Sequence, residues 1–243
     1  MDGIKSVFPT TKWTAVVEAA CSGDLQQRQQ ALTGLYQDYW MPLYAFSRRL
    51  GNDRHDAEDL TQGFFAYLLQ HAVLDSANRE MGTLRTFLLR VFQRYIGDVR
   101  DRENAQKRGG GVQLLSLDFN EEDMPFAGMD SSENPEVHYD RAWAHAVLRG
   151  TLQQLAALER AADRGRQFTV LEPCLNPEAD ADASHVDYAN ALGISVEAVR
   201  QTVSRLRKKF RDCLRERIAA TLQEPDDARI DEELRALKAV LRG

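Results

Sequence analysis

The chain has 243 residues, 43% of them hydrophobic, and a formal net charge of −6. This size and composition are typical of a soluble protein with one or two compact domains. No run approaches the roughly 18 apolar residues that a membrane span needs, and the first residues lack the apolar block of a secretory signal, so we expect a cytoplasmic protein without membrane contact. The three cysteines have no CxxC or Cys/His pairing, which predicts reduced thiols and no zinc site: Cys21, Cys174 and Cys213.

Residues 1–30 are predicted as an N-terminal extension, and residues 31–108 as a first helical domain. In this domain apolar residues recur at helical spacing, for example at Leu84, Phe87, Leu88 and Val91. The last part of the domain, 85–108, has seven Lys or Arg against three acids, which gives it a net charge of +4. A basic helical segment in an acidic chain is a candidate surface for nucleic acid.

Residues 109–140 differ in composition from the segments on either side. They begin with three glycines and, over 118–140, hold eight acids and no Lys or Arg. A segment this polar and rich in turn residues cannot form a core, so we predict a flexible acidic linker between two small helical domains. The only strand candidate is the short apolar run at 112–117, which fits an extended linker segment equally well. The sequence therefore predicts an all-α fold.

Residues 141–218 are predicted as the second helical domain, with a polar loop at 178–183, and residues 219–243 as a C-terminal helical extension. The domain ends in a second basic block, 200–217, where eight Lys or Arg against two acids give a net charge of +6. In the extension Ile230, Leu234, Leu237 and Leu241 form one apolar stripe. We expect this stripe to pack on a neighbouring part of the chain; docking to a partner is the alternative.

The segment 187–209 is predicted to form a helix-turn-helix. Ser184 and Asp187 have the spacing of a capping box at the start of a short helix. Gly193 can adopt the left-handed conformation that ends this helix, and Ser195 can cap the next one. On the second helix the apolar residues recur at i, i+4, i+7 and i+11 and predict one buried face: Val199, Val203, Leu206 and Phe210.

The opposite face of the second helix carries long donors and basic side chains. Such residues near the start of a helix suit the major groove of DNA, where they contact guanine edges and phosphates. The alternative is the solvated face of an ordinary amphipathic helix, which we disfavour because the glycine-centred turn and the one-sided charge coincide. The predicted DNA contacts are Arg200, Gln201, Ser204, Arg205 and Lys208.

Two regions of the chain resemble one protein family. The segment DAEDLTQ at 56–62, which precedes Phe64 and Phe65, and the segment LRTFLLRV at 84–91 with the Arg-rich run to 108 closely resemble region two of extracytoplasmic-function sigma factors. The segment LGISVEAVR at 192–200 resembles region four of the same family. The two regions follow in the family's order and are separated by a linker, which makes the resemblance specific.

The resemblance implies an alternative sigma factor that binds core RNA polymerase and directs promoter recognition and transcription initiation, with no catalytic residues and no cofactor. It implies that the second helix of the helix-turn-helix reads the −35 element and that residues 74–84 form the loop that captures a flipped base of the −10 element. It also implies a polymerase-binding set, Asp56, Glu58, Asp59 and Gln62, and a −10 set, Arg85, Arg90, Arg94 and Arg100.

One departure from the family pattern suggests a form of control. Gly63 stands where relatives usually have Glu, so the polymerase-binding face lacks one negative charge. Thr61 lies on the same turn as Asp59 and Gln62, and a phosphate there would add about −1.5 to −2 charges. We therefore hypothesise that a Ser/Thr protein kinase phosphorylates Thr61 and so raises the affinity for polymerase.

Two other functions remain as alternatives at this stage. A stand-alone helix-turn-helix transcriptional regulator would bind a palindromic duplex as a dimer without polymerase. A metal-dependent hydrolase would use His55, Asp56, Glu58 and Asp59, but neither a phosphate-binding glycine loop nor a second ligand set accompanies them. We favour the sigma factor over both.

Overall fold

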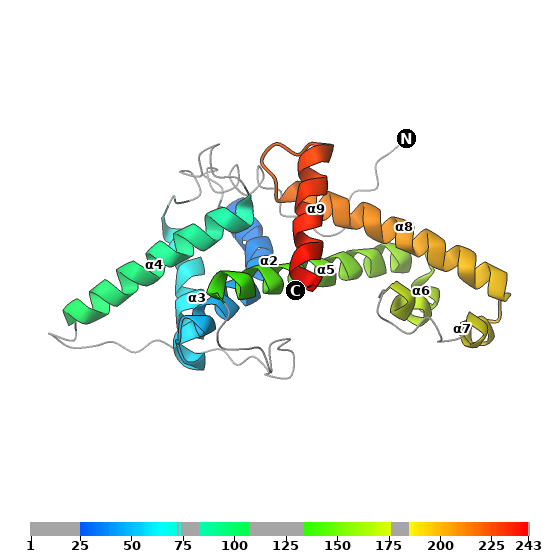
Figure 1. Ribbon diagram of the computed structural model, residues 1–243, viewed down its shortest axis with the longest axis horizontal. Helices are drawn as coiled ribbons and strands as arrows, with labels where there is room; N and C mark the ends of the chain where they lie inside the picture. The colour runs from blue at the N-terminus through cyan, green and yellow to red at the C-terminus, as the bar shows by residue number, and fades with distance from the viewer. Residues whose placement is uncertain (1–24, 72, 74–82, 107–133, 176–184, 243) are drawn as a thin grey trace. The chain divides into compact units, whose positions relative to one another are not determined.

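The computed structural model describes residues 25–71, 73, 83–106, 134–175 and 185–242 (Figure 1). Within these ranges the secondary structure is helical, with one isolated bridge between Thr83 and Leu222 and no strand. The prediction of an all-α fold is thereby confirmed. The helices are α2 (Leu25–Arg49), α3 (Arg54–Gln70), α4 (Leu84–Gln106), α5 (Pro135–Ala161), α6 (Gly165–Leu171), the 3₁₀ helix η3 (Glu172–Leu175), α7 (His185–Leu192), α8 (Val196–Ala220) and α9 (Asp227–Arg242).

Several predicted segments lie outside the described residues. These are the N-terminal extension up to residue 24, the last two residues of the predicted first domain, the linker from 109 to 133 with its strand candidate, the loop at 178–183, and residues 74–82 of the base-capturing loop. The last part of the predicted linker is described and is helical, because α5 begins at Pro135. Proline suits the first position of a helix, where its missing N–H has no intrahelical partner to lose.

The chain divides into two compact units. Among the described residues, one unit, which we call the α6–α8 unit, comprises those from Val147 to Arg217. The other, the α2–α4 unit, comprises those up to Ala146 together with those from Ile218 on. These boundaries differ from the predicted ones at 141 and 219. The first half of α5 and all of α9 belong to the α2–α4 unit, in which Tyr139 and Trp143 of α5 are buried.

Aromatic side chains from three helices form the core of the α2–α4 unit. The ring of Phe92 on α4 lies 5.0 Å from that of Phe64 on α3 and 6.2 Å from that of Phe46 on α2, between ring centroids. Tilted and edge-to-face pairs at these distances add to the stabilisation from burial alone. Helix α3 begins where the side chain of Asp53 accepts a hydrogen bond from the backbone N–H of Asp56 at 2.9 Å.

Helix α9 contributes its apolar stripe to the same unit. Ile230 and Leu237 are buried, and Leu234 and Leu241 are half-buried. The prediction that the stripe packs on the chain is thereby confirmed. The adjoining backbone is also attached to α4, because the N–H of Leu84 donates to the carbonyl of Thr221 at 3.2 Å.

The core of the α6–α8 unit joins four helices. Its buried residues are Leu155, Phe168, Leu171, Ala189, Val199, Val203 and Leu206. At its edge the carboxylate of Glu159 on α5, which is 2% exposed, pairs with Lys209 of α8 and with Arg164, whose Nε lies 2.6 Å from it. A buried carboxylate needs such partners to stay charged. Glu159 therefore ties α8 to the end of α5.

Candidate nucleic-acid interface

The turn between α7 and α8 has the geometry that the sequence predicts. Gly193 has a φ of +66°, the N–H of Gly193 donates to the carbonyl of Asn190 at 3.3 Å, and the N–H of Ile194 donates to that of Ala189 at 3.1 Å. These two bonds form a Schellman motif, which satisfies the last carbonyls of a helix. The hydroxyl of Ser195 then accepts from the N–H of Ala198 at 3.2 Å and caps α8.

Helix α8 has the two faces that its sequence predicts. Val199, Val203 and Leu206 are buried in the core, and Phe210 is half-buried against it. All five predicted DNA contacts are exposed: Arg200, Gln201, Ser204, Arg205 and Lys208. The helix-turn-helix therefore presents a continuous polar and basic surface, and we call these five residues the reading face.

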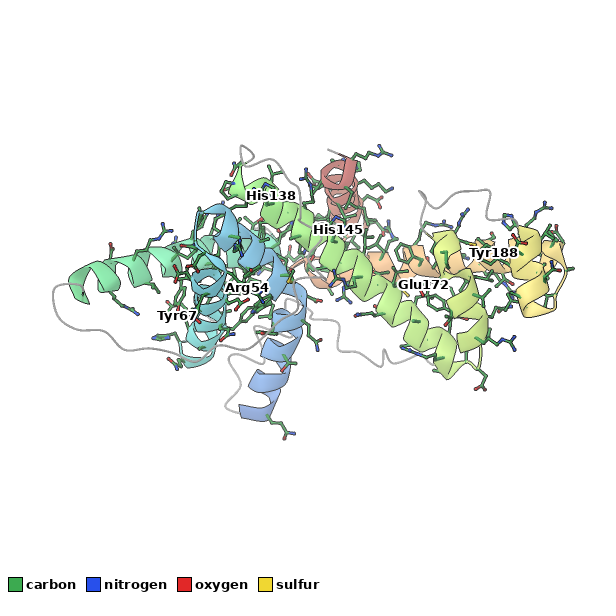
Figure 2. All side chains as sticks on the ribbon, turned by 90° about the horizontal axis from the view of Figure 1, so that it is seen from below. Arg54, Tyr67, His138, His145, Glu172 and Tyr188 are labelled. Atoms are coloured by element: carbon green, nitrogen blue, oxygen red, sulfur yellow. The ribbon has the colours of Figure 1, made fainter. Side chains whose placement is uncertain are left out.

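Neighbouring side chains hold this motif in place. Arg166 of α6 donates to the carbonyl of Ala191 in α7 at 3.4 Å, and Arg207 of α8 donates to the carbonyl of Cys174 at 2.9 and 3.2 Å. Tyr188 of α7, labelled in Figure 2, packs against the core. The basic residue Arg207 therefore has a structural role, although it lies within the basic block.

One residue on the exposed side of α8 is not among the predicted DNA contacts. Glu197, in the first turn, accepts a hydrogen bond from Nε2 of Gln201 at 3.4 Å and lies 3.7 Å from the guanidinium of Arg200. Its side chain is 66% exposed. Its spacing of i, i+3 and i, i+4 to these two residues was a signal in the sequence, because residues so spaced are neighbours on a helix surface.

The predicted polymerase-binding residues on α3 do not form one exposed patch. Asp56 is exposed and Asp59 partly so, with Oδ2 3.1 Å from Nδ1 of His55. Glu58 is only 6% exposed, and its carboxylate pairs at 3.0 Å with Arg54, which is labelled in Figure 2. The role of Glu58 as a polymerase contact therefore stays a prediction, and in this structure its charge is already neutralised within α3.

Gln62, like Glu58, is partly enclosed by the fold. Gln62 is half-buried, and its Nε2 atom is fully buried with no hydrogen-bond partner among the residues that the structure describes. The exposed acids Asp56 and Asp59 are therefore the better candidates for a basic partner.

Thr61 has a different environment from the one its predicted role requires. Its residue is 0% exposed, and its hydroxyl donates to the carbonyl of Ala57 at 2.7 Å. Thr61 lies on the same turn as Asp59, but its side chain is buried and not part of the exposed face of α3. A kinase must reach the hydroxyl that it modifies, so phosphorylation requires this part of α3 to open first.

The absence of a side chain at Gly63 has a structural cause. A Cβ atom at this position would lie 2.3 Å from the phenolic oxygen of Tyr95 on α4. Tyr95 therefore occupies the space that a larger residue at Gly63 would need. At position 63, where relatives usually have Glu, α3 and α4 are therefore in close contact through Tyr95.

The basic residues of α4 fall into two groups. Arg90, Arg94 and Arg100 are exposed, and Nη2 of Arg100 donates to Oδ1 of Asn52 at 3.4 Å. Arg85 is instead engaged within the protein, and its side chain is only 16% exposed. Three of the four predicted −10 contacts thus remain available to a nucleic acid strand.

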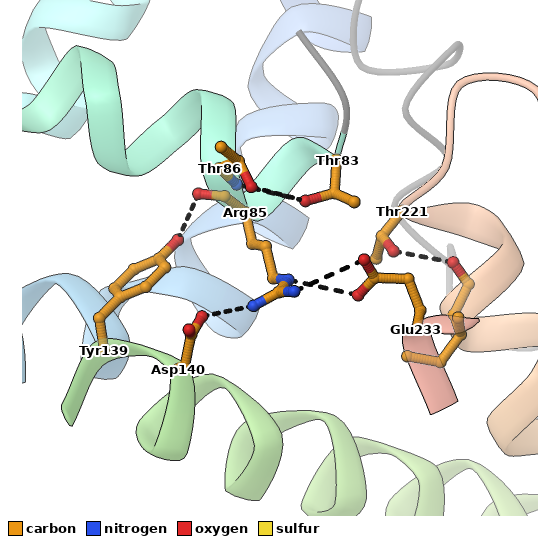
Figure 3. Close-up of polar contacts among 8 residues, drawn as sticks. Thr83, Arg85, Thr86, Tyr139, Asp140, Thr221 and Glu233 are labelled. Atoms are coloured by element: carbon orange, nitrogen blue, oxygen red, sulfur yellow. Dashed lines mark hydrogen bonds and ion pairs between the residues drawn. The ribbon is translucent and has the colours of Figure 1, made fainter. Parts of the chain in front are cut away.

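The guanidinium of Arg85 joins three segments of the α2–α4 unit (Figure 3). Its Nη1 donates to Asp140 of α5 at 2.5 Å, and its Nε lies 3.3 Å from Oε2 of Glu233 on α9. It also lies 4.8 Å from the ring centroid of Trp143, within the range of a cation–π contact. The hydroxyl of Tyr139 donates to the backbone carbonyl of Arg85 at 2.9 Å. Its role as a strand contact stays a prediction, and in this conformation both carboxylates already bind its donors.

Two properties of the described residues bear on the other functions considered. They contain no cluster of three or more His, Cys, Asp or Glu side chains that could hold a metal ion. The hydrolase candidate set is not assembled, since Glu58 pairs with Arg54 instead. No helix in the part of the chain that the structure describes combines the length and the apolarity that crossing a membrane requires.

Comparison with known proteins agrees with this architecture. The model of the ECF sigma factor family matches residues 10–216, and the chain belongs to this family of transcription initiation factors. It is similar to the ECF RNA polymerase sigma factor SigE of Mycolicibacterium smegmatis, with 26% identity over 211 residues that cover 86% of this chain and 70% of the relative. No solved structure matches the chain.

Proposed function

We propose that the chain is an alternative sigma factor that binds core RNA polymerase and directs it to promoters whose −35 element is read by α8. The observation that carries the proposal is the reading face, because all five of its side chains are exposed at the start of a helix that follows a Schellman turn. In helix-turn-helix proteins this helix lies in the major groove with its first turns against the base edges. Membership of the ECF sigma factor family supports the assignment to transcription initiation.

The α2–α4 unit has the features of a strand-binding and polymerase-binding module. Arg90, Arg94 and Arg100 place three exposed cations along α4, where the phosphates of an opened −10 strand are suitable partners. Asp56 and Asp59 on α3 are the acids available to a basic surface of the polymerase. We do not extend the proposal to phosphorylation of Thr61, because its hydroxyl is buried and hydrogen-bonded.

Run-off transcription with core polymerase tests this function. We expect the full chain to direct specific initiation and Arg205→Ala to weaken it, since a lost base or phosphate contact costs about 1 to 3 kcal/mol, or roughly 5- to 150-fold. Arg149→Ala is the matched control, because Arg149 is an exposed arginine of the same unit on α5. Core polymerase that gains no promoter specificity from the chain would contradict the proposal.

A gel shift separates the sigma factor from a stand-alone regulator. A regulator binds a palindromic duplex tightly on its own, whereas a sigma factor depends on polymerase for most of its promoter affinity. Tight and specific binding of the purified chain without polymerase would favour the regulator.

A further inference from the structure

Glu197 places a carboxylate within an otherwise neutral or basic surface. Residues 197, 201, 204 and 208 follow one another at i, i+4, i+7 and i+11, so they form one stripe along α8. Glu197 is the first member of this stripe, and the other three are Gln201, Ser204 and Lys208 of the reading face. In a helix-turn-helix the first turn of this helix is the part that enters the groove most deeply.

A negative charge at this position opposes binding to DNA phosphates. An acid in the first turn does benefit from the positive end of the helix dipole. That benefit does not depend on which face of the helix carries the acid, and Ser195 already caps the helix through the N–H of Ala198. The position of Glu197 beside the reading face therefore suggests a partner in the groove.

The contacts of Glu197 within the chain leave it available to such a partner. Its distances to Gln201 and Arg200 are 3.4 and 3.7 Å, and its side chain and that of Arg200 are 66% and 63% exposed. Exposed pairs of this kind are weak. An ionised carboxylate has about four acceptor sites, so these two neighbours orient the group without saturating it.

We propose that Glu197 is a specificity-determining residue that accepts a hydrogen bond from the N4 amino group of a cytosine in the −35 element. In the major groove cytosine presents only its N4 amino donor, adenine presents an amino donor next to the N7 acceptor, and guanine and thymine present acceptors without an amino donor. A carboxylate is attracted to the amino donor and repelled by the acceptors, so cytosine is the base edge that suits it best. This inference rests on the proposed function, because it takes α8 as the helix that reads the promoter.

A promoter library with a randomised −35 element and a transcribed barcode tests the inference. Core polymerase with the full wild-type chain is expected to enrich one position for cytosine on one strand. Glu197→Gln and Glu197→Ala are each expected to lower that enrichment by roughly 5- to 150-fold, the range for loss of one good base contact. Glu216→Gln is the matched control, because it removes the same charge from an exposed glutamate of the same helix, and it is expected to keep the wild-type preference.

Different outcomes separate the inference from the proposed function. If the wild-type chain selects no −35 sequence with core polymerase, the proposed function fails. If both Glu197 variants keep the wild-type base preference and gain affinity for all sequences alike, Glu197 reads no base. If Arg200→Ala abolishes the preference at the same position as Glu197→Ala, Glu197 acts only by positioning Arg200, and the inference is overturned. Melting temperatures within a few degrees of wild type establish that the variants are folded.

Discussion

Glu233 of α9 contributes to a partly buried ion pair, and its removal has a calculable cost. In Glu233→Ala the guanidinium of Arg85, which is 16% exposed, loses one of its two carboxylates and retains Asp140. Stranding a buried charge completely costs about 3 to 5 kcal/mol. Because Asp140 remains as a partner, we expect the free energy of unfolding of the α2–α4 unit to fall by about 2 to 3 kcal/mol. Replacing both Arg85 and Glu233 by methionine removes the two more buried charges together and leaves Asp140, whose side chain is 34% exposed, to the solvent. We expect it to restore at least half of this loss, as apolar replacement of buried ion pairs often does.

Urea unfolding followed by tryptophan fluorescence measures this change. Residues 147–217 contain no tryptophan, so the fluorescence reports on the α2–α4 unit, in which Trp40 and Trp143 are buried. Glu232→Ala is the control, because Glu232 is the acid next to Glu233 and is exposed, and a surface change is expected to stay within about 0.5 kcal/mol. Equal losses in Glu233→Ala and Glu232→Ala would refute the reasoning, since the effect would then reflect net charge and not the Arg85 contact.

Three further predictions concern buried or closely packed residues. Gly63→Ala is expected to raise the free energy of unfolding by about 1 kcal/mol only in a Tyr95→Phe background, where the nearest remaining ring atom is 3.4 Å from the new Cβ. A similar increase in the free energy of unfolding with Tyr95 intact would show that the contact is not tight. Thr61→Asp is expected to lower the free energy of unfolding by about 3 kcal/mol or more, because it buries an unpaired carboxylate. Thr61→Val is expected to change the free energy of unfolding by less than about 1.5 kcal/mol. An unaltered melting temperature in Thr61→Asp would show that Thr61 is exposed and not buried. Burial alone would raise the pKa of Glu159, but its two basic partners hold that pKa below the ordinary value. The stability that the ionised carboxylate contributes is therefore fully present above the ordinary glutamate pKa and is lost as the pH falls through the lowered pKa of the folded protein. Circular dichroism is therefore expected to show the stability gap between wild type and Glu159→Gln narrowing toward low pH, and a constant gap would contradict this account.

The helix-turn-helix was predictable because its determinants are local. The turn depends on Gly193, the cap on Ser195, and the buried face on an apolar period that spans three turns of α8. Each of these signals acts within a few residues of sequence. Local rules therefore predicted both the buried and the exposed face.

The environment of Arg85 was not predictable in this way. Its two carboxylate partners lie 55 and 148 residues away in the sequence, and no periodic pattern connects them. The unit to which α9 belongs was not predictable for the same reason, because its apolar stripe indicates that the helix packs but not which part of the chain it packs on. Only tertiary structure places α9 with the α2–α4 unit.

The burial of Thr61, in contrast, had a signal in the sequence. Ala57, Thr61, Phe64 and Leu68 follow at i, i+4, i+7 and i+11, and all four are buried. Thr61 is the polar member of this stripe, and its hydroxyl is satisfied inside the core because it donates to the carbonyl four residues earlier. Such back-bonding lets a threonine enter a core with its polar group satisfied.

The internal use of basic residues bears on how an acidic chain can read DNA. Arg85, Arg207 and Lys209 lie in the two basic blocks, yet each binds a carboxylate or carbonyl of the protein itself. The number of cations available to phosphates is therefore smaller than the sequence count indicates. Since the salt-dependent part of DNA affinity scales with the phosphates neutralised, the free chain should bind nonspecific DNA weakly. Because the free chain binds DNA weakly, nonspecific sites do not titrate it, and promoter recognition depends on polymerase.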